Sequence, residues 1–242
     1  MAPPFIPFDA EPHGHWPLIN DDGGLALLLI DFQRDFLSPD GYFAAAGYDV
    51  AEAQKVAATV RPLLLAARRA GVPVFHTREG HRASLRDLPR YKRLRSAEAG
   101  AAVGAPSPLG GGFLTRGSPG WEIVPELAPT PDEEIFDKPG YGAFTATDLD
   151  HCLRCVGVRK LIVAGLTAEV CVSSTVREAT DRGYECVVMR DGVAATDPRN
   201  LGGALGALTC EGGIFGSVAD VRVAIEALER LAGERETRET RE

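Results

Sequence analysis

Short apolar runs alternate with longer segments of helical periodicity along most of the chain, and this alternation limits the fold more than any other feature. Strands are expected over residues 25–30, 72–76, 134–136, 161–164, 186–189 and 213–215. Helices are expected over residues 50–70, 147–156, 172–182, 201–209 and 217–231. Strands separated by helices form parallel pairs joined by crossover connections. The sequence therefore predicts an α/β fold, with three α/β/α layers around a mostly parallel central sheet.

A single domain over residues 25–232 is expected, because 242 residues are enough to bury one sizeable core and no internal repeat is visible. Residues 1–24 form a proline-containing N-terminal extension without the basic start and apolar segment of a secretory signal. Residues 233–242, with the sequence GERETRETRE, are uniformly polar and are expected to be frayed or disordered.

Composition excludes several classes of partner. The net charge of −8 argues against nucleic acid and anionic membranes as main partners. Apolar runs fall short of the roughly eighteen residues that span a bilayer. The five cysteines, an odd number without framework spacing, fit reduced thiols. We therefore expect a cytoplasmic protein with no membrane contact and no nucleic-acid partner.

Cys152 and Cys155 form a C-x-x-C pair that has two alternative explanations. A zinc site would require a second pair or histidines at suitable spacing, and the sequence has neither. A redox pair would lie at a helix start after a strand, whereas this pair falls inside the predicted helix 147–156. Packing within a helix is the favoured interpretation.

Three chemically different side chains follow predicted strands. Asp31, Lys138 and Cys171 lie shortly after the strands that end at residues 30, 136 and 164. Each has a simpler explanation when taken alone: a turn cap, a solvated loop lysine, and a small buried hydrophobe. Ligands of open parallel sheets bind at the carboxyl ends of the strands. The coincidence of the three residues at that edge therefore predicts a reactive site.

Cys171 is expected to stand where a buried strand gives way to a helix. Unpaired amide groups and the helix dipole at such a position stabilise an anion. A thiol in that field can have its pKa lowered towards the thiolate, which is the nucleophilic form.

Three segments carry a resemblance to a known family. They are residues 31–36 (DFQRDF), 138–144 (KPGYGAF) and 165–172 (GLTAEVCV), and they resemble the three signature segments of the isochorismatase-like cysteine hydrolases. The resemblance covers roughly residues 25–217. The chain is most similar to the biuret hydrolase branch, through segments outside these motifs at residues 76–82, 114–121, 146–149, 177–186 and 212–217.

The resemblance implies a mechanism. Cys171 would be the nucleophile, Asp31 the general base and acid, and Lys138 the third catalytic member. The backbone N–H groups of Thr167 and Cys171 would form the oxyanion hole, with a cis peptide between Leu166 and Thr167. These roles agree with the chemistry of amide cleavage, because a thiol needs a base and the leaving nitrogen needs an acid. Ammonia would leave, and water would hydrolyse the thioester.

No cofactor and no metal are expected. Zinc-binding nicotinamidases of this family carry an aspartate–x–histidine pair soon after the first motif, whereas no histidine occurs between Asp31 and His76. A Ser-His-Asp hydrolase is disfavoured because the chain lacks a Gly-x-Ser-x-Gly elbow.

Three further residues are candidates for contact with the substrate. The resemblance implies a pocket wall at Phe36 and a steadying role for Gln33, although both have purely structural alternatives. Biuret hydrolases carry a glutamine where this chain has Glu211. An ionised carboxylate only accepts hydrogen bonds, so it would match a cationic substrate such as guanylurea. The alternative is that Glu211 faces solvent or pairs with an arginine.

The resulting prediction is a cysteine amidohydrolase that cleaves a small linear ureide or amide of the biuret type. Ureidoacrylate and cyclic amides are alternative substrates. A non-catalytic binding module is the alternative from another class, and the intact Asp31, Lys138 and Cys171 argue against it. The resemblance also implies a homo-oligomer, with a tetramer favoured. An isochorismate-cleaving enzyme is disfavoured because members of that kind typically lack the cysteine.

Overall fold

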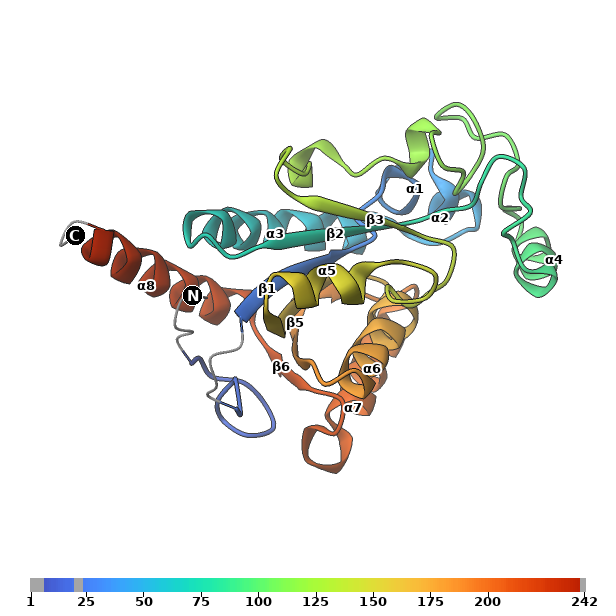
Figure 1. Ribbon diagram of the computed structural model, residues 1–242. Coiled ribbons are helices and arrows are strands. Elements are labelled where there is room, and N and C mark those ends of the chain that lie inside the picture. The colour runs from blue at the N-terminus through green and yellow to red at the C-terminus, as the bar shows by residue number, and fades with distance from the viewer. Residues whose placement is uncertain (1–6, 20–23, 240–242) are drawn as a thin grey trace.

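A parallel sheet forms the centre of the molecule, as the alternation of strands and helices predicted. In the computed structural model, which describes residues 7–19 and 24–239, the sheet has six strands in the order β3-β2-β1-β4-β5-β6 (Figure 1). All neighbouring strands are parallel. Their bounds are β1 (Gly24–Ile30), β2 (Val74–Glu79), β3 (Glu134–Lys138), β4 (Val158–Leu166), β5 (Glu185–Ala194) and β6 (Ser217–Ala219).

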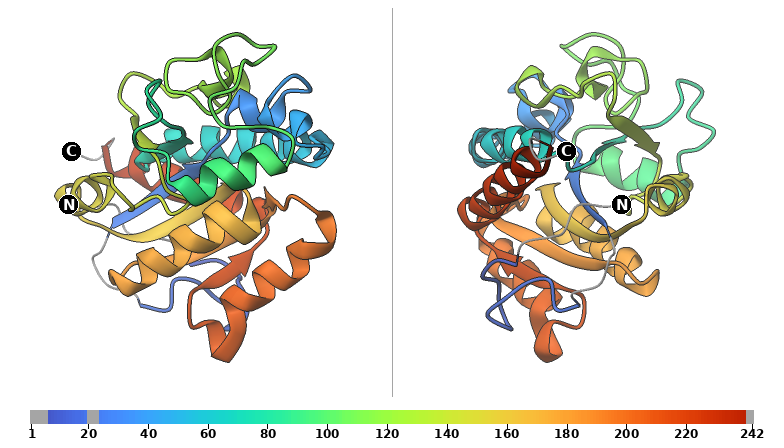
Figure 2. Two further views of the ribbon diagram at one scale, coloured as in Figure 1. Left: turned by 90° about the vertical axis from the view of Figure 1, so that its right-hand side faces the viewer. Right: turned by 60° about the vertical axis from the view of Figure 1, so that its left-hand side comes forward.

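Helices cover both faces of the sheet, which confirms the three-layer α/β/α fold (Figures 1 and 2). On one face α3 (Ala51–Arg69) packs against α8 (Val221–Glu239). The other face carries α5 (Leu149–Cys155), α6 (Ser173–Asp181) and α7 (Pro198–Gly213). Three short helices lie in the connections: α1 (Arg34–Leu37), α2 (Tyr42–Ala45) and α4 (Arg90–Glu98). Within the described residues, no helix has both the length and the apolar character needed to cross a bilayer.

Strand β1 shows why an apolar run becomes a central strand. All seven of its residues are buried, and alternate side chains enter the two separate cores. Leu27 and Leu29 pack under α3, whereas Leu28 and Ile30 pack on the opposite face. A strand buried on both faces needs a continuous apolar run rather than an alternating pattern.

The register of the strands brings their carboxyl ends to one level. Ile30 pairs with Thr77 on β2 and with Gly165 on β4, and Glu79 pairs with Lys138 at the ends of β2 and β3. Residues just after these pairs therefore meet at one edge of the sheet. This edge holds the site described below.

The last predicted strand is wrong by a few residues. The expected strand 213–215 does not form, and β6 occupies Ser217–Ala219, which had been assigned to the start of the final helix. Gly213 and Gly216 adopt φ values of +84° and +149°, which interrupt an extended chain. The final helix starts only at Val221.

Both ends of the described chain have ordered structure. Helix α8 continues through Glu239, across most of the segment 233–242 that was expected to be disordered. Arginine and glutamate are good helix formers, and this stretch contains neither proline nor an interior break. In the N-terminal extension, Phe8 and Trp16 are buried against each other, and Glu11 pairs with Val218 at the open edge of β6. Residues 1–6, 20–23 and 240–242 lie outside the described residues.

Candidate active site

Asp31, Lys138 and Cys171 meet at the carboxyl edge of the sheet. The Lys138 ammonium lies 2.7 Å from Asp31 Oδ2 and 3.5 Å from Cys171 Sγ. All three side chains are buried. Asp31 follows β1 with a φ of +58°, and the Thr77 hydroxyl donates to its Oδ1 at 2.7 Å. The three residues that follow separate strands in the sequence therefore form one cluster.

Lys138 is held in place by carbonyl groups as well as by charge. Its Nζ donates to the carbonyl oxygens of Gly140 at 3.2 Å and Tyr141 at 2.9 Å. Burial lowers the pKa of Lys138, but its interactions with Asp31, Cys171 and Glu79 outweigh burial and raise the pKa above its ordinary value. Lys138 is therefore a permanent cation in the cluster.

Cys171 lies in a single π-helical turn, Ala168–Val172, between β4 and α6. The preceding peptide bond between Leu166 and Thr167 is cis, as the resemblance implied. The Thr167 carbonyl accepts hydrogen bonds from the N–H groups of Val170 and Val172, which fixes the turn. Thr167 and Cys171 face the same pocket.

The pKa of Cys171 moves in the direction opposite to the one expected from its place at a helix start. Burial raises it well above the ordinary value, Lys138 opposes the rise, and Asp31 and Glu79 add to it. Only 4% of the residue is exposed, so loss of water outweighs the favourable field of the helix start. The resting sulfur is consequently a thiol, and its reactivity depends on a neighbouring base.

Asp31 has a raised pKa as well. Burial is the largest cause, Lys138 lowers the pKa, and Glu79 raises it. A raised pKa makes this carboxyl group easier to protonate than an ordinary aspartate, as a group that both takes up and releases a proton requires.

Glu79 is a fourth member of the cluster that the sequence analysis missed. Cys171 Sγ donates to Glu79 Oε2 at 3.4 Å, and Lys92 Nζ lies 2.6 Å from Glu79 Oε1. Burial raises the pKa of Glu79, but Lys92 and Lys138 together hold it below its ordinary value. Glu79 is therefore an ionised carboxylate in contact with the sulfur.

Gln33 lies behind the site and fixes Glu79. Its side-chain amide donates to the Glu79 carbonyl at 2.9 Å, and its oxygen accepts from the Glu79 N–H at 2.7 Å. It also donates to the Trp121 carbonyl at 2.9 Å and is completely buried. The structure thus places Gln33 in a supporting position rather than in the pocket wall.

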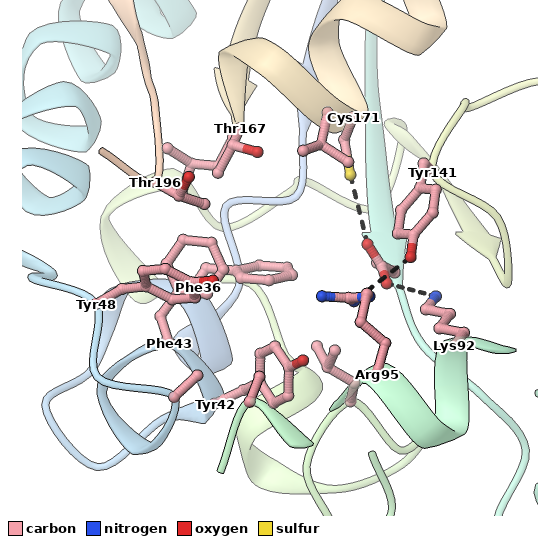
Figure 3. Close-up of a pocket in the computed structure, with 16 residues that line it drawn as sticks. Phe36, Tyr42, Phe43, Tyr48, Lys92, Arg95, Tyr141, Thr167, Cys171 and Thr196 are labelled. Atoms are coloured by element: carbon pink, nitrogen blue, oxygen red, sulfur yellow. Dashed lines mark hydrogen bonds and ion pairs between the residues drawn. The ribbon is translucent and has the colours of Figure 1, made fainter. Parts of the chain in front are cut away.

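A small pocket of about 170 Å³ opens in front of Cys171 (Figure 3). Phe36 forms part of its wall together with other aromatic side chains of the first connection, as expected. Helix α4 contributes Lys92 and Arg95. Glu211 is not among the described residues that line this pocket; its side chain is exposed near the end of α7. The expectation of a cationic substrate bound by Glu211 therefore has no support in the pocket.

Asp31, Glu79 and Cys171 form a group of possible metal ligands. Their ligand atoms lie within 4.8 Å of one another, which is close enough for one ion. The Lys138 ammonium already stands 2.7 Å from Asp31 and 3.9 Å from Glu79. The protein's own cation thus supplies the positive charge that these carboxylates need.

Comparison with known proteins agrees with this geometry. Residues 25–220 match the sequence profile of the isochorismatase domain. The chain belongs to the isochorismatase family. The family match covers the sheet and every residue of the cluster described above.

Several solved structures superpose on most of the chain. A cysteine hydrolase from Pseudomonas syringae pv. phaseolicola 1448A is 28% identical with a TM-score of 0.72, covering 86% of this chain and 93% of its own. An isochorismatase family protein from Desulfovibrio vulgaris is 27% identical with a TM-score of 0.70, covering 86% and 99%. N-carbamoylsarcosine amidase from Thermoplasma acidophilum is 25% identical with a TM-score of 0.61, covering 81% and 96%.

The missed residues left different signals in the sequence. Glu79 would have followed from the strand-end rule if the second strand had been extended three residues past His76. Lys92 and Arg95 are three positions apart and share a face of α4. That helix is dominated by charged residues, so apolar periodicity gave no indication of it.

Proposed function

We propose that this isochorismatase-family protein is a cysteine hydrolase that cleaves the C–N bond of a small amide or ureide and releases ammonia. The observation that carries the proposal is a buried thiol within 3.5 Å of the Lys138 ammonium and 3.4 Å of Glu79, next to a carboxyl group of raised pKa. Two of the similar structures support the proposal by their names, one a cysteine hydrolase and the other N-carbamoylsarcosine amidase.

The first half of the reaction uses the sulfur and Asp31. Asp31 accepts the thiol proton as Sγ forms a bond to the carbonyl carbon. The carbonyl oxygen becomes an oxyanion, which the N–H groups of Thr167 and Cys171 are proposed to stabilise. Removing one donor of this kind typically slows an enzyme by about 10²–10³-fold. Asp31 then protonates the leaving nitrogen, the C–N bond breaks, and ammonia departs from a thioester.

The second half restores the enzyme. Asp31 takes a proton from water as the water oxygen attacks the thioester carbon. The C–S bond breaks, the acid product forms, and the proton returns to sulfur. Lys138 offsets the negative charge that moves between sulfur and Asp31, while Glu79 accepts the thiol hydrogen bond and orients the sulfur.

The pocket supports a small substrate. A volume of about 170 Å³ with aromatic walls suits a compact planar molecule, such as a biuret-like ureide, better than a peptide or nucleotide. A thiol placed beside two carboxyl groups and an ammonium favours an enzyme over a non-catalytic binding module, because binding alone does not require this arrangement.

The direct test is ammonia release across a panel of ureides and carboxamides. We expect release by the wild-type protein, none by Cys171→Ser, and normal release by Cys155→Ser, which changes an exposed cysteine outside the site. Iodoacetamide labelling read by peptide mass spectrometry should match loss of activity to Cys171 alone. Ammonia release that persists in Cys171→Ser would contradict the proposal.

A further inference from the structure

Helix α4 places one unmatched cation in the pocket. Figure 3 shows Arg95 reaching from α4 towards the cavity, on the side opposite Thr167 and Thr196. Its Nη2 donates to the Tyr141 hydroxyl at 3.5 Å, and its side chain is half-buried. Among the described residues, Arg95 makes no ion pair with a carboxylate.

The other charges around the sulfur and the pocket are matched in pairs. Lys138 lies 2.7 Å from Asp31, and Lys92 lies 2.6 Å from Glu79. Two carboxylates therefore face three cations, and Arg95 carries the charge that remains. Both acidic groups are engaged near the sulfur, so neither reaches the guanidinium.

The surroundings of Arg95 favour a planar anion. Tyr42 and Tyr141 line the same pocket as the guanidinium, and the Tyr141 hydroxyl accepts its hydrogen bond. A guanidinium binds a carboxylate with two parallel hydrogen bonds, and tyrosine hydroxyls can donate further bonds to the same group. Because arginine keeps its charge at all accessible pH values, a neutral ligand would leave that charge half-buried and uncompensated.

We propose that Arg95 is the anchor for a carboxylate on the substrate, so that the preferred substrates are small amides or ureides that end in a carboxylate. This inference rests on the proposed function for the scissile end and adds the chemistry of the distal end. It reverses the charge preference that Glu211 suggested, since a cationic end would be repelled by Arg95.

The first experiment measures binding without turnover. Propionate and 2-butanone have nearly the same shape and differ in charge, and neither has a C–N bond to cleave. Each is tested for protection of Cys171 against iodoacetamide, with labelling read by peptide mass spectrometry. We expect propionate to protect at concentrations about 10–100-fold lower than 2-butanone, because hydrogen bonds between charged groups are stronger than those of a neutral carbonyl.

Variants on α4 identify the group responsible. Arg95→Gln should abolish the preference for propionate, and Arg95→Lys should keep part of it. Arg93→Gln, which changes an exposed arginine two positions earlier, should keep all of it. Circular dichroism checks that each variant is folded. Equal protection by the two compounds in the wild type, or an unchanged preference in Arg95→Gln, would overturn the inference.

Turnover separates this inference from the proposed function. Ammonia release is compared for N-carbamoylglycine, its methyl ester and 2-aminoethylurea, which carry a negative, neutral and positive end. We expect the carboxylate to have the lowest KM, and Arg95→Gln to raise that KM about 10–100-fold with a smaller effect on kcat. Wild-type turnover that does not favour the carboxylate, while Cys171→Ser remains inactive, would overturn the role of Arg95 and leave the cysteine mechanism intact.

Discussion

Substitution of Lys92 by methionine tests the buried ion pair that supports the site. Lys92 and Glu79 are each 6% exposed in their side chains, and their charged atoms are 2.6 Å apart. Lys92→Met keeps the length of the side chain but leaves the Glu79 carboxylate buried, with Lys138 at 3.9 Å as its nearest remaining cation. Breaking one side of a buried pair typically lowers the free energy of unfolding by about 3–5 kcal/mol.

A second variant separates two effects of Lys92→Met: the unpaired negative charge left on buried Glu79, and the loss of the other contacts of Lys92. In Lys92→Met/Glu79→Gln the buried charge is gone, so the double variant should recover about 2 kcal/mol or more relative to Lys92→Met. Arg93→Met changes an exposed residue of the same helix and should stay within about 0.5 kcal/mol of the wild type. Urea unfolding followed by tryptophan fluorescence and circular dichroism measures all four proteins.

The pH dependence of the free energy of unfolding tests whether the ionised Glu79 causes the destabilisation of Lys92→Met. In the wild type the pKa of Glu79 lies below its ordinary value, so its ionised form contributes stability above that range and loses it as the pH falls. Without Lys92 the pKa of Glu79 should rise, and protonation at lower pH then neutralises the unpaired carboxylate. The stability gap between Lys92→Met and wild type should therefore narrow between about pH 7 and about pH 4. A gap no larger than that of Arg93→Met, or one that does not depend on Glu79, would refute this reasoning.

Three other changes have defined outcomes. Lys138→Met should slow iodoacetamide labelling of Cys171 at fixed pH and reduce ammonia release by about 10²-fold or more, because the ammonium opposes the rise in the thiol pKa; an unchanged labelling rate would exclude that role. Gly165→Ala should lower the midpoint of urea unfolding by more than Gly157→Ala, because its Cβ would press on the Ile30 carbonyl, whereas Gly157 has open space. Burial raises the pKa of Glu133, but hydrogen bonds from Arg68 and His76 outweigh it and lower the pKa from 4.5 to about 2. Glu133→Gln should therefore lose stability at neutral pH. The loss should fade as the pH falls from 4.5 to about 2, because the unfolded carboxyl group binds a proton first and the folded one only at the lower pH; a loss that is constant with pH would contradict this prediction.

The central strands could be predicted from the sequence because burial on both faces demands continuous apolar runs. The runs at residues 25–30 and 161–164 became β1 and β4, and the strand-end rule placed Asp31, Lys138 and Cys171 at one edge. The same rule failed at Glu79. Residues 76–79 (HTRE) are polar, so the apolar pattern ends before the strand does, and the predicted strand stops at residue 76. Those side chains are polar because the carboxyl end of the sheet holds the site and not the apolar core.

The pocket walls could not be predicted from local patterns. Helix α2 has four residues, and α4 has mainly charged residues, so neither shows the apolar periodicity that marks a helix packed on a core. Segment 104–120 is rich in glycine, proline and serine, which is typical of a surface loop, yet Leu114 is buried and lines the pocket. Its N–H donates to the buried Asp35 carboxylate at 2.7 Å, a contact 79 residues apart in sequence. Such packing is set by tertiary contacts that no short window of sequence contains.

The pKa values of the two carboxyl groups beside the sulfur are shifted in opposite directions. This difference supports separate roles for them in the proposed mechanism. Lys92 and Lys138 both act on Glu79, so its pKa is lowered and it remains an acceptor. Burial raises the pKa of Asp31, and the negative charge of Glu79 adds to the rise. Lys138 is the lysine that opposes it, and the pKa remains raised. A group that takes a proton from sulfur and delivers it to nitrogen must be able to hold that proton in between. The raised pKa of Asp31 favours it over Glu79 as the proton carrier of the proposed mechanism, and the lowered pKa of Glu79 suits an acceptor that orients the thiol.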